Sequence, residues 1–303
     1  MSLEWQARPG SLAWSNPVSW WWGLLTLVSG INIAVWFVLY RELPLPSAGA
    51  ASASSIGTML LFCAAYVFGC AFRSFLPRAD VQRICLFDTW LSSVLVGRSV
   101  ATVAEIAFVA QWAILLHQFG SMTGAETVVN VAWVIVPLIL IAECLSWYAV
   151  LTRNYLGNAI ENSLWAVAFF AIGVALCRLL PEFHGVVRLV VAVSIAGIAA
   201  YLAFLMTIDV PMYLKRWRTG DADGDKRLTP REGLRDVRTR WVVTHDIAEW
   251  KEEMAWMALY FSLAVWSSLA LCVACALEHQ LPPYRTTAAV ESTTPFVPVD
   301  VQR

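Results

Sequence analysis

Residues 18–40 read VSWWWGLLTLVSGINIAVWFVLY and contain no charged side chain. A helix of about 20 apolar residues crosses the hydrocarbon core of a bilayer, which is about 30 Å thick. The tryptophans at 20–22 suit the membrane–water interface, because an indole ring buries its apolar body and keeps its N–H group hydrated. The stretch therefore predicts a membrane-spanning helix that begins at the interface.

Six further apolar stretches follow the first. The same argument from length predicts spans at residues 56–76, 99–116, 128–150, 159–180, 186–208 and 254–277. The apolar run at 84–119 is too long for a single perpendicular helix. We therefore expect residues 84–96 to form an interfacial or strongly tilted start of the third span, with Gly97 as a break. The predicted fold class is an all-α polytopic membrane protein with seven transmembrane helices.

The composition supports this class. Hydrophobic residues make up 59% of the chain and charged residues 14%, whereas a soluble domain carries about 25% charged residues. This deficit excludes an ordinary soluble enzyme. The seven cysteines are odd in number and lie mostly in apolar runs, so they are interpreted as small buried side chains and not as a disulfide framework.

The basic residues predict the orientation. Seven spans place the N-terminus and residues 77–83, 151–158 and 209–253 on one side of the membrane. All three lysines and seven of the 18 arginines lie between Lys215 and Lys251. Because cytoplasmic loops are rich in Lys and Arg, we expect the N-terminus and residues 209–253 in the cytoplasm and the C-terminus outside, in the cytoplasmic membrane of the cell.

The same pattern divides the chain. The expected parts are six helices in residues 1–208, a cytoplasmic segment at 209–253, a seventh helix at 254–277 and a disordered extracytoplasmic tail at 278–303. The expected partner is the lipid bilayer, with anionic head groups at the basic 215–251 segment. No basic groove indicates nucleic acid, and a homo-oligomer is left open.

The cytoplasmic segment contains the sequence DADGDKRLTPRE at residues 221–232. Asp221, Asp223 and Asp225 alternate along the chain, and Glu232 closes the stretch. A hard cation such as Ca²⁺ binds six to eight oxygen atoms at 2.3–2.6 Å. Alternating carboxylates with a further carboxylate at the end of a short loop can supply such a shell. The spacing therefore predicts a cation site.

These twelve residues resemble the EF-hand calcium loop. The resemblance implies a cytoplasmic helix–loop–helix between the sixth and seventh spans. It also implies Ca²⁺ as cofactor, with ligands from the side chains of Asp221, Asp223 and Asp225, the backbone carbonyl of Arg227 and a bidentate Glu232. Position 226 carries Lys where the family has Gly. The alternative interpretation is a solvated acidic turn in which Glu232 only caps a helix that begins after Thr229.

Among the ionisable residues within or at the ends of predicted spans, four are candidates for a functional site, namely Arg98, Glu105, Glu143 and Glu161. Insertion of each such residue into the membrane costs about 2.5–3.5 kcal/mol on insertion scales, so each requires a structural or functional explanation. Arg98 and Glu105 are seven residues apart and share one helix face. One hypothesis is a polar pocket or an ion path built from all four. The other is interhelical hydrogen bonding, with long side chains that reach the interface.

No nucleophile elbow, zinc motif or phosphate-binding loop is present, so the sequence predicts no particular enzyme activity. Our first hypothesis is a multipass membrane protein whose calcium loop regulates the packing of the last two helices. The alternatives are a transporter or channel that uses the intramembrane carboxylates, and a membrane enzyme that modifies a lipid. A dry, tightly packed helix core would count against both alternatives.

Overall fold

The computed structural model describes residues 15–43, 51–222 and 227–278. Within these ranges, seven helices are long and apolar enough to cross a membrane. The predicted all-α polytopic class is therefore confirmed. Asp223, Asp225 and the tail at 279–303 lie outside the described residues, so the expectations for them stay predictions.

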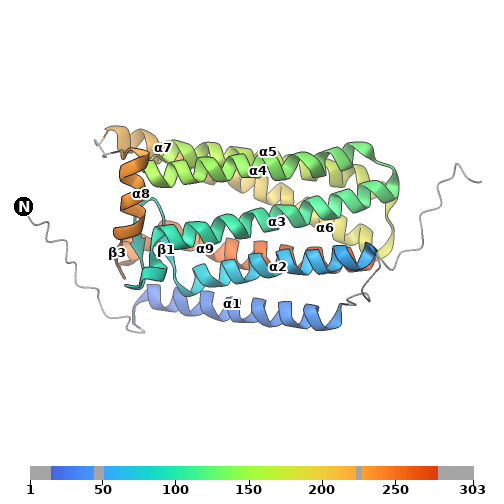
Figure 1. The fold of residues 1–303 in the computed structure, drawn as a ribbon, viewed down its shortest axis with the longest axis horizontal. Helices are drawn as coiled ribbons and strands as arrows, with labels where there is room; N and C mark the ends of the chain where they lie inside the picture. The colour runs from blue at the N-terminus through green and yellow to red at the C-terminus, as the bar shows by residue number, and fades with distance from the viewer. Residues whose placement is uncertain (1–14, 44–50, 223–226, 279–303) are drawn as a thin grey trace, which may run out of the picture.

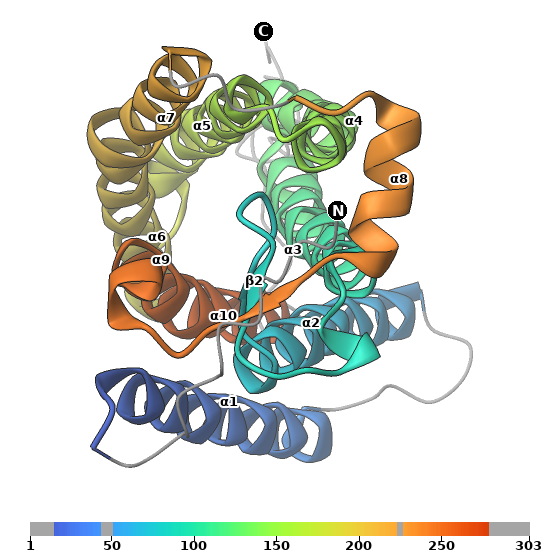
Figure 2. The same ribbon diagram turned by 90° about the vertical axis from the view of Figure 1, so that its left-hand side faces the viewer.

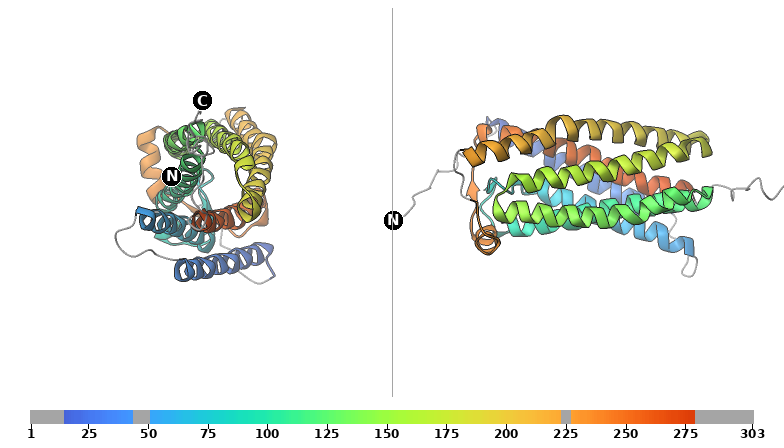
Figure 3. Two further views of the ribbon diagram at one scale, coloured as in Figure 1. Left: turned by 90° about the vertical axis from the view of Figure 1, so that its right-hand side faces the viewer. Right: turned by 90° about the horizontal axis from the view of Figure 1, so that it is seen from above.

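The long helices run side by side along one axis (Figures 1 and 3). Their bounds are α1 Pro17–Glu42, α2 Ala51–Phe75, α3 Val94–Thr123, α4 Glu126–Thr152, α5 Tyr155–Leu179, α6 Gly185–Phe204, α7 Val210–Ala222, α9 Ile247–Leu259 and α10 Val265–Glu278. Short π-helices join α6 to α7 and α9 to α10, at Leu205–Asp209 and Tyr260–Ala264. Short 3₁₀ turns occupy Trp90–Ser92 and Leu180–Glu182.

Tight connections make α3, α4 and α5 antiparallel neighbours. Gly124 ends α3 in the left-handed conformation at φ 66°, and α4 begins two residues later. Arg153 ends α4 in the same conformation at φ 56°, and the Asn154 side chain then accepts a hydrogen bond from the Leu156 N–H at 3.1 Å to start α5. Left-handed caps of this kind satisfy the last carbonyls of a helix and reverse the chain.

The expectation of a helical segment at residues 84–96 was wrong. Ile84–Cys85 forms β2, which pairs antiparallel with β1 (Arg78–Ala79) and parallel with β3 (Val242–Val243). The apolar residues Ile84 and Cys85 form a buried strand, which explains why this part of the sequence is apolar without being helical. The third span begins only at Val94, where Ser93 caps it. Apolarity alone does not distinguish a short buried strand from a helix.

Gly97 is not a break, because α3 continues through it. Its lack of a side chain admits the guanidinium of Arg78, which a Cβ atom at this position would overlap. Arg78 donates to the carbonyl oxygens of Ser93 and of Val94, the latter at 3.1 Å. It also pairs with Asp80 at 3.0 Å. The glycine therefore lets the β1–β2 hairpin dock against the start of α3.

The hairpin lies across one end of the helix bundle (Figure 2). We call this end, where α8 (Pro230–Thr239) also lies, the hairpin end, and the other the opposite end. Arg83 pairs with Asp236 of α8 at 2.8 Å and donates to the carbonyl oxygen of Val150 at 2.7 Å. Gly233 of α8 rests on the carbonyl of Leu151, and a Cβ atom would overlap that oxygen. The hairpin and α8 are thus fixed to the end of α4.

Charged groups in the hairpin compensate for one another. Burial lowers the pKa of Arg78 to about 10, although Asp80 opposes this effect. Burial would raise the pKa of Asp80, but Arg78 and Arg73 outweigh it and hold that pKa below its usual range. Asp80 is therefore an anion at neutral pH, and it keeps two buried arginines paired with negative charge.

Helices α7, α8 and the start of α9 occupy much of the segment at 209–253. Helix α7 carries the sixth span on to Ala222, and α9 starts the last span at Ile247. Arg216 joins the two helices, because it pairs with Glu253 at 3.3 Å and with Glu252. Sixth and seventh spans are therefore linked at the hairpin end by charged side chains.

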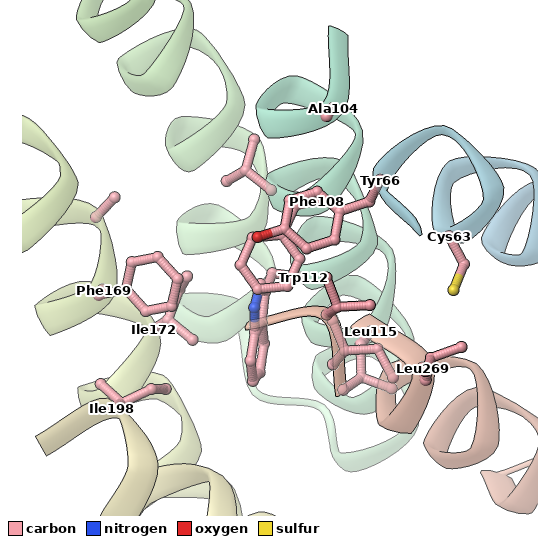
Figure 4. Close-up of a cluster of buried hydrophobic side chains, with 14 of the residues drawn as sticks. Cys63, Tyr66, Ala104, Phe108, Trp112, Leu115, Phe169, Ile172, Ile198 and Leu269 are labelled. Carbon is pink, nitrogen blue, oxygen red and sulfur yellow. The ribbon is translucent and has the colours of Figure 1, made fainter. Parts of the chain in front are cut away.

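Aromatic side chains fill the middle of the bundle (Figure 4). Tyr66 and Phe108 stack with their ring centroids 4.5 Å apart, and Trp112 meets Phe169 edge to face at 6.4 Å. Tyr66, Trp112 and Ile172 are 3% exposed or less. The large exposed side chains on the outer helix faces are apolar, such as Leu61, Trp133 and Phe170, as expected for a surface that faces lipid.

Candidate functional site

The structure brings the four intramembrane residues together. A single nitrogen of Arg98, Nη2, lies 2.7 Å from Glu143 Oε2, 3.1 Å from Glu105 Oε2 and 3.5 Å from Glu161 Oε1. The arginine and Glu105 come from α3, Glu143 from α4 and Glu161 from α5. Each residue is 8% exposed or less. We call these four residues the carboxylate cluster.

Hydrogen bonds from neighbouring side chains hold the glutamates in place. Thr102 donates to Glu143 Oε2 at 2.6 Å, and Trp147 Nε1 donates to the Thr102 hydroxyl at 3.0 Å. Asn158 Nδ2 donates to Glu161 Oε2 at 3.1 Å. Because each carboxylate receives its own donor, the three side chains keep fixed positions around the guanidinium.

Tyr260 completes the contacts to Glu105, and sequence reasoning missed it. Its hydroxyl donates to Glu105 Oε1 at 3.3 Å. The residue begins the π-helix between α9 and α10, a distortion that often occurs at functional sites. Asn32 of α1 supports this turn, because its Nδ2 donates to the carbonyl of Phe261 at 3.0 Å. The available signal in the sequence was Asn32, a polar residue within the first predicted span, because a buried amide needs a hydrogen-bond partner on another helix.

Helix spacing explains why these residues meet. Arg98, Thr102 and Glu105 fall at i, i+4 and i+7 on one face of α3. Helices α4 and α5 approach closely at Gly157, where a Cβ atom would lie 2.7 Å from Ala149 Cβ. Small residues at a contact let two helices in a membrane pack tightly. This approach brings the side chains of Glu143 and Glu161 within reach of the same guanidinium.

The cluster lies in the half of the membrane nearer the hairpin end. Glu161 is six residues from the start of α5, which is about 9 Å at 1.5 Å per residue. Glu143 is nine residues from the end of α4, or about 14 Å. The aromatic core described above lies between the cluster and the opposite end.

The cluster holds more negative than positive charge. One oxygen of each of the three glutamates lies within 4.8 Å of the other two. Three ionised carboxylates against one guanidinium leave an excess of two negative charges. Buried like charges at this distance repel strongly, because the low dielectric screens them poorly. The site therefore requires further positive charge, supplied as protons or as a metal ion.

A small cavity reaches Glu105. Its volume is about 10 Å³, which is enough for about one water molecule. It is lined by Gly69, Cys70, Arg73, Ala101, Ala104, Glu105, Tyr260 and Phe261. One wall of the carboxylate cluster is thus open to a small polar ligand, while the cavity has no room for a lipid chain.

The predicted calcium loop is described only at its ends. Asp221 lies in the last turn of α7, and Glu232 in the first turn of α8. Glu232 Oε2 accepts hydrogen bonds from the Thr229 N–H at 2.9 Å and hydroxyl at 2.8 Å, so the capping box is present. The backbone N–H of Leu228 donates to the Thr152 carbonyl at 3.1 Å. Calcium binding by Asp221, Arg227 and Glu232 stays a prediction.

Comparisons of the chain with protein-family models, curated proteins and solved structures gave no match. The class of protein is therefore defined by its fold and by the site described above. The chain is an α-helical integral membrane protein with seven candidate spans and a buried cluster of three glutamates and one arginine.

Proposed function

We propose that the protein transports cations across the membrane and that the carboxylate cluster is the binding site. The observation that carries this proposal is the charge of the cluster, in which Glu105, Glu143 and Glu161 surround the single guanidinium of Arg98. Burial of such a group is costly unless it binds something, and ionisable residues inside a membrane typically mark ion pathways. The bound cation is a proton or a metal ion.

Polar side chains support access from the hairpin end. Asn162, next to Glu161 in α5, donates to Asp209 Oδ2 at 2.6 Å. Nearer the end of the bundle, Arg216 and Glu253 pair at 3.3 Å, and Glu252 beside them is largely exposed. We propose that these groups line the route by which a cation passes between the surface and the cluster. The aromatic core separates the cluster from the opposite end, so we expect the cation to enter from the hairpin end.

We further propose that the hairpin end faces the cytoplasm. Most of the basic residues, including those of the 215–251 segment, lie in the parts of the chain at this end, in agreement with the positive-inside rule. Anionic head groups of the cytoplasmic leaflet are then the expected lipid contacts. A lipid-modifying enzyme is less well supported, because the cavity at the cluster holds only about one water molecule.

The test is transport in vesicles. The purified protein is reconstituted into liposomes, and cation movement is followed with a dye for internal pH and with dyes for divalent cations. We expect the variants Glu105→Gln and Glu143→Gln to lose most of the flux, at least about tenfold, because each removes a negative charge from the site. Glu126→Gln, in the exposed first turn of α4, is the matched control. Equal flux in all four proteins would refute the proposal.

A second function, calcium regulation, is favoured by the helix–loop–helix order of α7 and α8. The capping box at Thr229 and Glu232 starts α8 where the exit helix of an EF-hand loop starts. The Leu228–Thr152 hydrogen bond ties this loop to the end of α4, which carries Glu143. We propose that Ca²⁺ orders residues 221–232 and thereby biases the packing of α4 and of the last two spans.

Calorimetric titration of the whole purified protein with Ca²⁺ tests this second function. We expect Asp221→Ala and Glu232→Gln to weaken the binding at least about tenfold, because a carboxylate closing the loop supplies two oxygen ligands. Thr229→Ala removes only the capping box and is the control. Its heat of Ca²⁺ binding should be close to that of the unmodified protein. The same heat in Asp221→Ala, Glu232→Gln and the unmodified protein would exclude the site.

A further inference from the structure

We propose that the side of the carboxylate cluster between α4 and α5 binds one hard divalent metal ion, with oxygen ligands from Glu143, Ser146, Asn158 and Glu161. This inference rests on the proposed function and names its cation as a metal ion of the Mn²⁺, Mg²⁺ and Ca²⁺ class. The reasons are unpaired oxygens at this interface, their arrangement and the balance of charge.

Three buried side-chain oxygens at the interface have no hydrogen-bond partner among the described residues, namely Glu143 Oε1, Ser146 Oγ and Asn158 Oδ1. Glu143 is 3% exposed, Ser146 0% and Asn158 8%. A buried polar atom left unpaired costs about 1–3 kcal/mol, and a charged one costs more. Three such oxygens together indicate a ligand that accepts electron pairs from all of them.

The unpaired oxygens belong to two neighbouring helices, α4 and α5. Ser146 is one turn after Glu143 on α4, and Asn158 is one turn before Glu161 on α5. Asn158 already contacts Glu161 through its nitrogen, which leaves its oxygen for another partner. The Ser146 hydroxyl also interacts with the Glu161 carboxylate, although no hydrogen bond of normal geometry joins the two groups. The close approach at Gly157 brings these pairs together.

Charge favours a divalent ion over a water molecule. The guanidinium of Arg98 lies within 3.5 Å of all three carboxylates and neutralises one negative charge. Three ionised glutamates then leave two negative charges, which one divalent ion neutralises. A water molecule would satisfy the hydrogen bonds but would leave both charges buried. The guanidinium of Arg98 occupies the α3 side, so the metal ion lies on the α4–α5 side.

The ligand type selects the metal. All the proposed ligands are oxygen atoms, which Mg²⁺, Ca²⁺ and Mn²⁺ prefer, whereas softer ions prefer thiolate or imidazole. Cys144, next to Glu143 in the chain, is exposed on the helix surface and not among the four ligands. Mg²⁺ gives up its water reluctantly. A buried site with several protein oxygens therefore suits Mn²⁺ and Ca²⁺ better.

The experiment is Mn²⁺ binding to the purified full-length protein in detergent, followed by the loss of the free-Mn²⁺ signal in electron paramagnetic resonance. All proteins carry Asp221→Asn and Asp223→Asn, which removes binding by the predicted calcium loop. We expect about one Mn²⁺ per chain, and Glu143→Gln or Glu161→Gln should weaken it at least about tenfold. Asn158→Asp, which keeps an oxygen and adds charge, should bind as tightly or more tightly.

Asn158→Leu should weaken the binding, and Glu126→Gln is the control that should leave it unchanged. If the oxygen of residue 158 is a ligand, Asn158→Leu should weaken Mn²⁺ binding and Asn158→Asp should not. If the amide has only a structural role, both variants should weaken the binding. Absence of Mn²⁺ binding, or binding unaffected by Glu143→Gln, overturns the inference. Proton flux in vesicles that still depends on Glu143 would then keep the transport function, whereas Mn²⁺ binding without any flux would refute transport and keep the metal site.

Discussion

Arg98→Gln is expected to destabilise the protein by about 3–5 kcal/mol, the range found when one partner of a buried ion pair is removed. The variant leaves Glu105, Glu143 and Glu161 with no guanidinium, although each is 8% exposed or less. Glutamine still donates hydrogen bonds, so the lost stability measures the effect of removing the positive charge. The measurement is thermal unfolding of the purified protein in detergent, followed by intrinsic tryptophan fluorescence.

A second substitution should restore part of the lost stability. Arg98→Gln combined with Glu143→Gln removes one positive and one negative charge, and Glu143 is the nearest partner of the arginine at 2.7 Å. We expect the double variant to unfold at a higher temperature than Arg98→Gln alone. Arg188→Gln, near the start of α6 at the opposite end, is the matched control, since Arg188 belongs to no buried cluster among the described residues. A double variant no more stable than Arg98→Gln would show that charge balance is not what holds the cluster.

The seven spans could be predicted because membrane insertion depends on a local property, the length of an apolar stretch. Residues 18–40, for example, correspond to α1 at Pro17–Glu42. The members of the cluster could also be identified one by one, because a charge within a span is rare and costly. The sequence could not predict that the three glutamates surround one nitrogen of Arg98, because this arrangement depends on which helix faces pack together.

Two features of the site had no visible pattern in the sequence. The hairpin at residues 78–85 is stabilised by Arg78, which donates to carbonyl oxygens at the start of α3, and by Arg83, whose partners Val150 and Asp236 lie far along the chain. Tyr260 reaches Glu105 only because a π-helix shifts the register of the last span. Both features are set by tertiary contacts, which override the local preference of the chain.

Helix α7 illustrates the same limit in the polar segment. The sixth span was predicted at residues 186–208, and whether its helix continues past Pro211 was left open. The helix does continue to Ala222 through a π-helical turn at Leu205–Asp209, and Asn162 donates to the Asp209 carboxylate at 2.6 Å. The π-helical turn accommodates the proline, because Pro211 has no N–H to donate and its ring would clash with the carbonyl of Thr207, four residues earlier, in a regular α-helix.

The second large effect is expected from Gly97→Ala, which should destabilise the protein by about 3 kcal/mol although it adds only one methyl group. The new Cβ atom would overlap the guanidinium of Arg78, and adding a methylene to a well-packed site typically costs about 1–3 kcal/mol. Arg78 cannot move away without loss. It is 2% exposed, it donates to the Ser93 and Val94 carbonyls, and it pairs with Asp80.

Gly30→Ala provides the comparison, because no atom lies within 4 Å of the Cβ atom that it would add to α1. Alanine favours a helix over glycine by about 0.8–1.0 kcal/mol, so this variant should be as stable as the unmodified protein or slightly more so. The two variants make the same chemical change, and thermal unfolding in detergent measures both. If Gly97→Ala were as stable as Gly30→Ala, the hairpin would not be fixed by Arg78. The opposite result would mean that the position of Arg78, and with it that of its partner Asp80, depends on the absence of a methyl group at residue 97.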